Sequence, residues 1–170
     1  TDGTPDQPLA DTQELRRSAI VSNASIAISR ASSSLNADVD DVESCGCMVA
    51  ISLSGPGISL YSEQISFAIG SEIPIVIVNV QRLGPSTGSA TRGADGDINF
   101  MRWGSSSGLP VIVLAPVDVR DCYTLTMQAF NLAETYRCPV FVASNKEIGM
   151  TRESIDLATV ERPTVIDRAM

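Results

Sequence analysis

The stretch that decides the fold reads Ile73-Pro74-Ile75-Val76-Ile77-Val78-Asn79-Val80-Gln81-Arg82-Leu83-Gly84-Pro85-Ser86-Thr87-Gly88. Its first eight residues are mostly β-branched and apolar, which predicts a buried strand over residues 73–80. The apolar run stops at Gln81-Arg82 and opens into a loop that holds two glycines and a proline. In open parallel sheets, ligands bind at the carboxyl ends of strands. Arg82 at such an end is suited to a carboxylate or a phosphate, because its guanidinium is a rigid, permanently charged fork.

Short apolar runs and helical patterns alternate on both sides of this strand. We expect strands over residues 48–53, 73–80, 109–115 and 139–143, and helices over residues 58–69, 97–103 and 119–136. The last three strands are apolar without alternation, which indicates burial on both faces of a parallel sheet. The sequence therefore predicts an α/β fold, a mainly parallel sheet with helices on both faces.

The helices carry their own start signals and buried faces. Asp118 is placed to cap the helix over residues 119–136, and Asp121 lies in its first turn, where the helix dipole favours negative charge. The expected buried stripe of that helix comprises Cys122, Leu125, Ala129, Leu132, Ala133 and Tyr136. The expected buried face of the helix over residues 58–69 comprises Tyr61, Ile65, Ala68 and Ile69.

Composition narrows the function. The 170 residues are 44% hydrophobic and 19% charged, as in one globular domain, and the net charge of −8 argues against nucleic acid as a partner. No apolar run approaches the roughly 20 residues that span a bilayer, and the polar N-terminus does not resemble a signal peptide. We therefore expect no membrane partner and a cytoplasmic location with reduced cysteines.

The cysteines do not form a metal-binding pattern. The chain has four cysteines, no C-x-x-C pair and no histidine, so no zinc site or intrachain iron–sulfur cluster is expected, and no metal ligand is assigned. Cys45-Gly46-Cys47 suits either a redox pair or, the favoured interpretation, small residues that lead into a buried strand.

Three regions differ in character. Residues 1–44 are serine-rich and acidic without an aromatic residue. We expect this segment to be divergent or foreign, and weakly structured or helical, with a possible helix over Thr12–Ser29 and a solvated acidic run over Asp38–Glu43. Residues 45–150 form the expected α/β domain. Residues 151–170 are of mixed polarity and are expected to be a linker towards a missing domain. The absence of an initiator methionine suggests that the chain begins inside a longer reading frame.

Two loops and one aromatic residue carry candidate chemistry. The run Ser54-Gly55-Pro56-Gly57 joins a strand to a helix and lets a ligand or another backbone approach closely, although a tight turn without a ligand has the same pattern. It matches neither a phosphate-binding P-loop nor a dinucleotide fingerprint. Arg82 with Gly84, Pro85, Ser86, Thr87 and Gly88 suits a ligand site, and the alternative is an arginine paired with an acid at a domain edge. We expect Trp103 to be a packing residue.

Several segments together resemble one family. The residues that carry the likeness are Ser54–Glu63, Ile73–Gly88, Gly96–Ile98, Arg102–Gly104, Ala115–Tyr123, Ala129–Glu134 and Cys138–Val140. In this order and spacing they resemble the α subunit of 2-oxoacid:ferredoxin oxidoreductases, in particular the 2-oxoglutarate type, over roughly residues 45–150. The resemblance implies the pyrimidine-binding domain of a thiamine diphosphate enzyme, which oxidatively decarboxylates a 2-oxoacid to an acyl-CoA and passes electrons to ferredoxin.

The resemblance also implies roles for residues and partners. Arg82, with Ser86 and Thr87, would bind the substrate. Cofactor-binding residues would be Ser54, Gly55, Pro56, Gly57, Gly84, Pro85 and Gly88. Thiamine diphosphate would be shared with a β subunit that carries the diphosphate site, Mg²⁺ and an iron–sulfur cluster, and CoA would be the co-substrate. The isolated chain is therefore expected to be inactive.

One catalytic residue of the family is not found, so no catalytic residue is assigned. The family carries a glutamate about two dozen residues before the Ser-Gly-Pro-Gly loop, where it bonds the pyrimidine ring. That spacing falls near residues 28–32 here, and no acid occurs between Glu14 and Asp38. Two other hypotheses therefore stand beside the catalytic one. The chain is a non-catalytic assembly domain or an inactive gene fragment, or it is a small-molecule-binding α/β domain unrelated to thiamine.

Overall fold

The computed structural model describes residues 49–53 by their backbone, and residues 55–87, 89, 92–106, 108–164 and 166. The expected helix over Thr12–Ser29, the acidic run and the pair Cys45 and Cys47 lie outside these residues. The elements in chain order are β1 (Val49–Leu53), α3 (Pro56–Leu60), α4 (Ser62–Gly70), β2 (Ile75–Gln81), α5 (Ile98–Trp103), β3 (Ile112–Leu114), α6 (Val119–Tyr136), β4 (Val140–Asn145), α7 (Lys146–Met150) and the 3-10 helix η1 (Leu157–Thr159).

The strands form one parallel sheet in the order β1-β2-β4-β3. Leu53 at the end of β1 pairs with Asn79, and Gln81 at the end of β2 pairs with Asn145 at the end of β4. Because the strands are parallel, their carboxyl ends lie along one edge of the sheet. The predicted α/β fold is confirmed, and that edge is where its ligands are expected.

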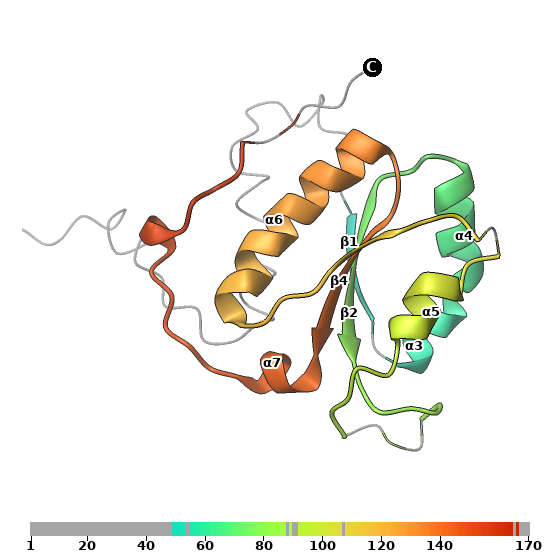
Figure 1. Cartoon of the computed structure of the whole chain (residues 1–170), viewed down its shortest axis with the longest axis horizontal. Coiled ribbons are helices and arrows are strands. Elements are labelled where there is room, and N and C mark those ends of the chain that lie inside the picture. Colours follow the sequence, from blue (N-terminus) through green and yellow to red (C-terminus); the bar gives the residue numbers. More distant parts are fainter. Residues whose placement is uncertain are drawn as a thin grey trace, which may run out of the picture.

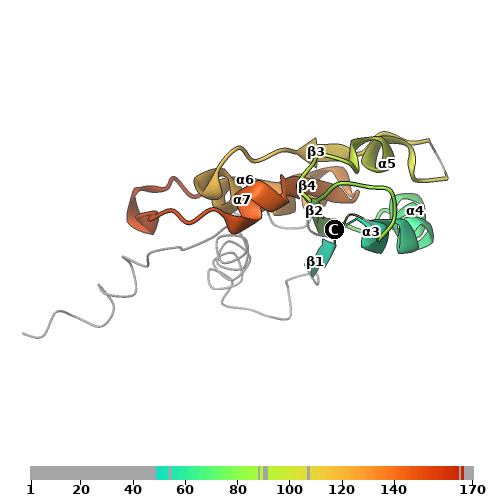
Figure 2. The same ribbon diagram turned by 90° about the horizontal axis from the view of Figure 1, so that it is seen from below.

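The connections explain which helices cover which face. The chain moves in one direction across the sheet from β1 to β2 to β3, and it reverses to insert β4 between β2 and β3. Right-handed crossovers place connections that run in opposite directions on opposite faces. Accordingly α3, α4 and α5 cover one face and α6 covers the other, so the sheet is the middle of three layers (Figures 1 and 2).

Each face of the sheet has its own apolar core. On the α6 side, Val76, Val78, Val140 and Val142 of the sheet pack with the buried face of α6. The tail joins this core through Ile155, Leu157 and Val160, all buried. On the opposite side, the core consists of Ile58, Ile65, Ile69, Ile77, Met101, Phe141 and Ala143. Alternate residues of β2 and β4 therefore serve different cores, which is why neither strand shows polar alternation.

Helix α6 begins and ends where the sequence predicts. Asp118 accepts a hydrogen bond from the backbone N–H of Asp121 at 2.7 Å, as an N-cap residue does. Cys122, Ala129 and Ala133 of the expected stripe are buried, but Tyr136 is 63% exposed. Tyr136 is the last residue of the helix, so its inclusion in the buried stripe was wrong.

The helix expected over residues 58–69 is two helices, α3 and α4, which meet at Tyr61. Ile65, Ala68 and Ile69 are buried as predicted, whereas Tyr61 is 41% exposed. Tyr61 stands between the two helices: it is the N-cap residue of α4, and its carbonyl oxygen accepts the N–H of Ile65 at 2.8 Å, but its side chain is not covered as those within α4 are. Its expected burial was therefore wrong.

The strand expected over residues 109–115 is reduced to the three residues of β3. It lies at the edge of the described sheet and pairs with β4 alone. Val113 is 42% exposed, so the expected burial on both faces holds for β2 and β4 but not for β3.

Candidate functional site

The ends of β1 and β2 bring Gly55 and Arg82 together. Gly55 has φ of +51° and ψ of −119°, a conformation that residues with a side chain rarely adopt. A Cβ at Gly55 would lie 3.0 Å from both Cζ and Nη2 of Arg82, and closer still to Nε. The glycine is therefore needed twice, for the backbone turn and for the space that the guanidinium occupies.

Arg82 lies in a cavity of about 330 Å³ at this edge of the sheet. The cavity is lined by Gly55, Pro56, Ile58, Ser59, Arg82, Gly84, Pro85, Ser86, Gly96, Asp97 and Phe100. One cation and one carboxylate, Arg82 and Asp97, stand among small and apolar residues. A concave, mainly apolar surface on which a few polar groups converge is typical of a small-molecule site.

The guanidinium of Arg82 is sparsely bonded by the protein. Its Nη2 donates to the carbonyl oxygen of Ser86 at 3.5 Å, while its Nε is buried and has no hydrogen-bond partner among the described residues. The described part of the chain provides no acid that pairs with it, so the predicted alternative of a structural ion pair is not seen there. Because Nε is buried, a ligand would meet the Nη1 and Nη2 end of the fork.

Asp97 is held by the side-chain amides of two β2 residues, one at its carboxylate and one at its backbone N–H. Nδ2 of Asn79 donates to Oδ2 of Asp97 at 3.2 Å, and the backbone N–H of Asp97 donates to Oε1 of Gln81 at 3.2 Å. Asn79 is fully buried and Gln81 is 3% exposed. None of these three residues was predicted to belong to the site. A polar amide inside the apolar run of residues 73–80 was a signal that could have identified Asn79, while Gln81 and Asp97 lie outside that run.

The loop after β2 is closed at its base. The backbone N–H of Leu83 donates to the carbonyl oxygen of Arg92 at 2.9 Å. A Cβ at Gly96 would lie 2.5 Å from the carbonyl oxygen of Arg82, so the returning chain passes directly against the arginine backbone. Nδ2 of Asn145 donates to Oδ1 of Asp95 at 3.2 Å and holds the same loop to the end of β4.

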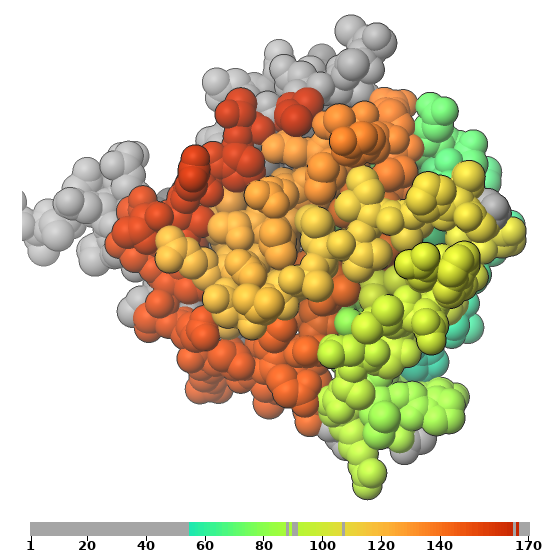
Figure 3. Space-filling model, in the orientation of Figure 1, coloured from blue at the N-terminus to red at the C-terminus, as the bar shows by residue number. Residues whose placement is uncertain are grey.

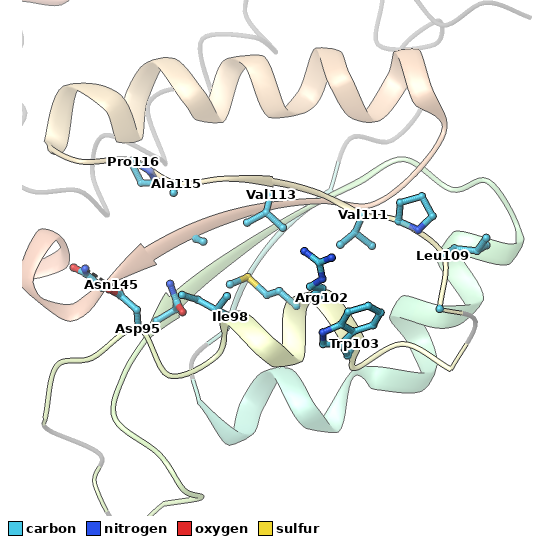
Figure 4. Close-up of a pocket in the computed structure, with 15 residues that line it drawn as sticks. Asp95, Ile98, Arg102, Trp103, Leu109, Val111, Val113, Ala115, Pro116 and Asn145 are labelled. Carbon is cyan, nitrogen blue, oxygen red and sulfur yellow. Dashed lines mark hydrogen bonds between the residues drawn. The ribbon is translucent and has the colours of Figure 1, made fainter.

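A second, larger cavity of about 720 Å³ lies between α5 and the chain that contains β3. In Figure 3 that chain, in yellow, crosses the front of the molecule above the lime-green residues of α5. Figure 4 shows Arg102 and Trp103 of α5 facing Val111 and Val113 across the cavity, with Asp95 and Asn145 at the other end. None of the predicted site residues lines it. We take the smaller cavity as the candidate site, because it contains Arg82 and other predicted site residues.

The predicted site residues divide into three groups. The smaller cavity brings together Gly55, Pro56, Arg82, Gly84, Pro85 and Ser86. Gly57 and Thr87 are described but do not line it. Ser54 and Gly88 lie outside the described residues.

Trp103 does not pack in the core. It is 64% exposed, and the guanidinium of Arg102 lies 4.8 Å from the centroid of its ring. The expectation of a packing residue was wrong: Trp103 is the last residue of α5 and lines the larger cavity.

Other functional groups lie away from the site. Burial raises the pKa of the Cys122 thiol to about 11 and also raises the pKa of Cys138. A thiol with a raised pKa is a poor nucleophile at neutral pH. Within the part of the chain that the structure describes, no three histidine, cysteine, aspartate or glutamate residues are grouped to hold a metal. Among those same residues no helix is both long and apolar enough to cross a bilayer.

Known proteins are similar to this chain in sequence. The chain is 46% identical over 112 residues to the 2-oxoglutarate synthase subunit KorA of Methanocaldococcus jannaschii, covering 66% of this chain and 31% of that protein. It is 42% identical over 111 residues to the ketoisovalerate oxidoreductase subunit VorB of Methanothermobacter thermautotrophicus, covering 65% of this chain and 31% of that protein. The chain thus spans about a third of the length of these relatives.

A solved structure and a family model agree with these relatives. The 2-oxoglutarate:ferredoxin oxidoreductase from Magnetococcus marinus, solved with 2-oxoglutarate, coenzyme A and succinyl-CoA bound, matches with a TM-score of 0.62 at 33% identity. The match covers 87% of this chain and 24% of that chain. Residues 44–169 match the model described as "Pyruvate flavodoxin/ferredoxin oxidoreductase, thiamine diP-bdg". The chain therefore belongs to the family of thiamine diphosphate-binding domains of pyruvate flavodoxin/ferredoxin oxidoreductases.

Proposed function

We propose that this chain is the pyrimidine-binding domain of the α subunit of a 2-oxoacid:ferredoxin oxidoreductase, with 2-oxoglutarate as the 2-oxoacid. The reaction is oxidative decarboxylation to an acyl-CoA. Family membership supports the reaction class, and the KorA relatives support the choice of 2-oxoglutarate. The likeness to a ketoisovalerate oxidoreductase subunit makes a branched 2-oxoacid the competing substrate to test.

The observation that carries the proposal is the state of Arg82. Among the described residues that line the smaller cavity it is the only basic one, and its Nη end makes a single long bond, to Ser86, within that part of the chain. A carboxylate held by two parallel N–H donors gains both charge and orientation. Arg82 would therefore hold a carboxylate of the substrate, with the hydroxyl of Ser86 or Thr87 as a supporting donor.

The smaller cavity fits one ring and one small acid rather than a whole thiamine diphosphate. Its 330 Å³ is at the low end of small-molecule sites, and its apolar wall of Pro56, Ile58 and Phe100 suits the face of a pyrimidine. Thiamine diphosphate, when bound, supplies the nucleophilic carbon for decarboxylation of the 2-oxoacid. Arg82 orients the acid, Gly55 and Pro56 leave room for the ring, and Asp97 offers a carboxylate beside it.

Partners complete the site in this proposal. Among the described residues that line the cavity, Arg82 is the one cation, which does not match a diphosphate, so we place the diphosphate site with its Mg²⁺ on a β subunit. The family resemblance supports an iron–sulfur cluster on the same subunit. CoA would be the co-substrate and ferredoxin the electron acceptor. We propose a cytoplasmic location, and we expect the chain by itself to be inactive. We also propose that residues 1–44 are divergent and that residues 45–150 form the functional domain. Residues 151–170, whose Ile155, Leu157 and Val160 pack on the α6-side core of this domain, would then lead towards a further domain.

The test uses the chain co-expressed with the β subunit of a KorA-type enzyme. Titration calorimetry measures binding of thiamine diphosphate with Mg²⁺, and dye reduction measures turnover of 2-oxoglutarate and of 3-methyl-2-oxobutanoate. We expect Arg82→Ala to raise the KM for 2-oxoglutarate by about ten- to a hundredfold, the cost of a lost charged hydrogen bond, with cofactor binding retained. Arg120→Ala is the control, since Arg120 lies in the first turn of α6, outside the smaller cavity, and donates to the carbonyl oxygen of Thr159. Equal KM values for the two variants would contradict the proposal.

A second candidate function is a non-catalytic assembly domain or an inactive fragment. It is favoured by the absence of an acid between Glu14 and Asp38, where the family glutamate is expected. The same complex distinguishes the two. Assembly without turnover, not rescued by a glutamate introduced at position 30, would select the assembly domain.

A further inference from the structure

Four helices of the described chain begin with an aspartate or asparagine at the N-cap position, and one of them behaves differently. Asp118, Asn145 and Asp156 each accept a backbone N–H of their own helix, at 2.7, 3.0 and 2.9 Å. Asp97 precedes α5 but its side chain makes no such bond. An N-cap bond is typically worth about 1 kcal/mol, so Asp97 forgoes a local stabilisation that its counterparts use.

The carboxylate of Asp97 is directed instead to the buried amide of Asn79. An ionised carboxylate only accepts hydrogen bonds, which requires that Asn79 offer Nδ2. The Oδ1 of Asn79 then remains buried without a partner among the described residues. A fully buried amide is costly to leave half-bonded. Residues that break a local rule in this way are typical of functional sites.

The bond matters because of what lies on each side of it. Asn79 lies on β2, three residues before Arg82. Gln81, the last residue of β2 and the neighbour of Arg82, accepts a hydrogen bond from the backbone N–H of Asp97. Gly96 is adjacent to Asp97 and lies against the carbonyl oxygen of Arg82. The two amides therefore fix the returning end of the loop to β2, the strand that Arg82 directly follows.

We propose that Asn79, Gln81 and Asp97 are positioning residues that hold the loop base against Arg82 and so keep its guanidinium in place beside Gly55. Neither amide lines the smaller cavity, so both act through other residues. The deeper consequence, that this clamp sets the affinity for the substrate carboxylate, rests on the proposed function. The effect of the clamp on the position of Arg82 does not depend on the proposed function, and that position can be measured without a ligand.

The first experiment is ¹⁵N NMR of the full chain. The Arg82 Nε–H signal is assigned from its loss in Arg82→Lys. Because Nε is buried, its proton should exchange slowly with water. We expect Asn79→Leu, which keeps the side-chain shape and removes the donor, to accelerate this exchange at least tenfold. Asn131→Leu is the matched control, since Asn131 of α6 bonds Thr164 instead. Unchanged protection of Arg82 in folded Asn79→Leu would overturn the proposal.

A second pair of variants covers the case in which Asn79→Leu does not fold. Asp97→Ala removes the acceptor from the half-buried end of the same bond, and Asp97→Asn retains an acceptor oxygen. We expect the Arg82 Nε proton to exchange fast with water in Asp97→Ala and to be protected again in Asp97→Asn. Equal protection in both variants would mean that this hydrogen bond does not position the arginine.

The affinity measurement separates this inference from the proposed function. In the complex with the β subunit, we expect Asn79→Leu to raise the KM for 2-oxoglutarate about tenfold, more than it lowers kcat. If Arg82→Ala leaves that KM unchanged, the proposed function fails while the NMR result still decides the positioning role. If Arg82→Ala raises the KM but Asn79→Leu does not, the clamp has no part in carboxylate binding and that consequence is wrong.

Discussion

Replacing Gly55 by alanine tests the geometry of the site most directly. The substitution adds one methyl group where the guanidinium of Arg82 already lies, with Cζ and Nη2 each 3.0 Å from the added carbon. It also places a side chain at φ of +51°, a strained conformation that costs on the order of 1–3 kcal/mol. Either the loop shifts or Arg82 moves, and both outcomes disturb the carboxylate fork.

Two quantities should change together. We expect the free energy of unfolding of Gly55→Ala to fall by about 1–3 kcal/mol in urea denaturation, from backbone strain. We expect the affinity for 2-oxoglutarate in the complex to fall roughly ten- to a hundredfold, because a hydrogen bond to a charged group is worth about 1.5–3 kcal/mol.

Gly70→Ala is the matched control. Gly70 is the last residue of α4, and an added Cβ there would meet no atom within 4 Å. Its replacement should be neutral or stabilise the chain by up to about 1 kcal/mol. If Gly55→Ala unfolds at the same urea concentration as Gly70→Ala and keeps its affinity for 2-oxoglutarate, the contact between Gly55 and Arg82 does not exist as described.

Three further results are expected. Asp118→Ala removes the cap of α6, the 2.7 Å bond from the Asp121 N–H, and should lower the free energy of unfolding in urea by about 1 kcal/mol without altering 2-oxoglutarate binding; an unchanged midpoint would refute the cap. Folding raises the pKa of the Cys122 thiol from 9.0 to about 11, so the protonated thiol contributes to folding stability fully below pH 9, and this contribution is lost as the pH rises towards 11. The melting temperature should therefore fall less between pH 9 and 11 in Cys122→Ala than in the wild type. Asn145→Ala should speed hydrogen–deuterium exchange of the loop after β2, since it loses the 3.2 Å bond to Asp95, and equal exchange would show that this bond does not restrain the loop.

The arrangement of the candidate site shows how far local pattern reaches. Arg82 and the loop at Gly55 were identified from the sequence because both follow apolar strands directly, and parallel strands bring their carboxyl ends to one edge. Asp97 was identified only as the start of a short helix. Its bond to Asn79 joins residues 18 positions apart, and no sequence periodicity encodes such a contact.

Exposure was the property that the sequence predicted least well. Tyr61, Trp103 and Tyr136 are large, and each was expected to pack in the core, yet all three lie at helix ends and are 41% to 64% exposed. Helical periodicity assigns a face only within a helix, so it does not say whether the neighbouring layer covers a side chain at a helix end.

The sequence by itself determined the parallel α/β fold, the start and end of α6, and the arginine at the end of β2. These features depend on local patterns of apolar and capping residues, which act over a few positions. Only the tertiary structure decided the strand order β1-β2-β4-β3, the half-exposed edge position of β3, and the packing of the Arg82 guanidinium in the space left by the missing side chain of Gly55. Those features depend on contacts between segments far apart in the chain, where packing and the handedness of crossovers choose among arrangements that local pattern leaves equal.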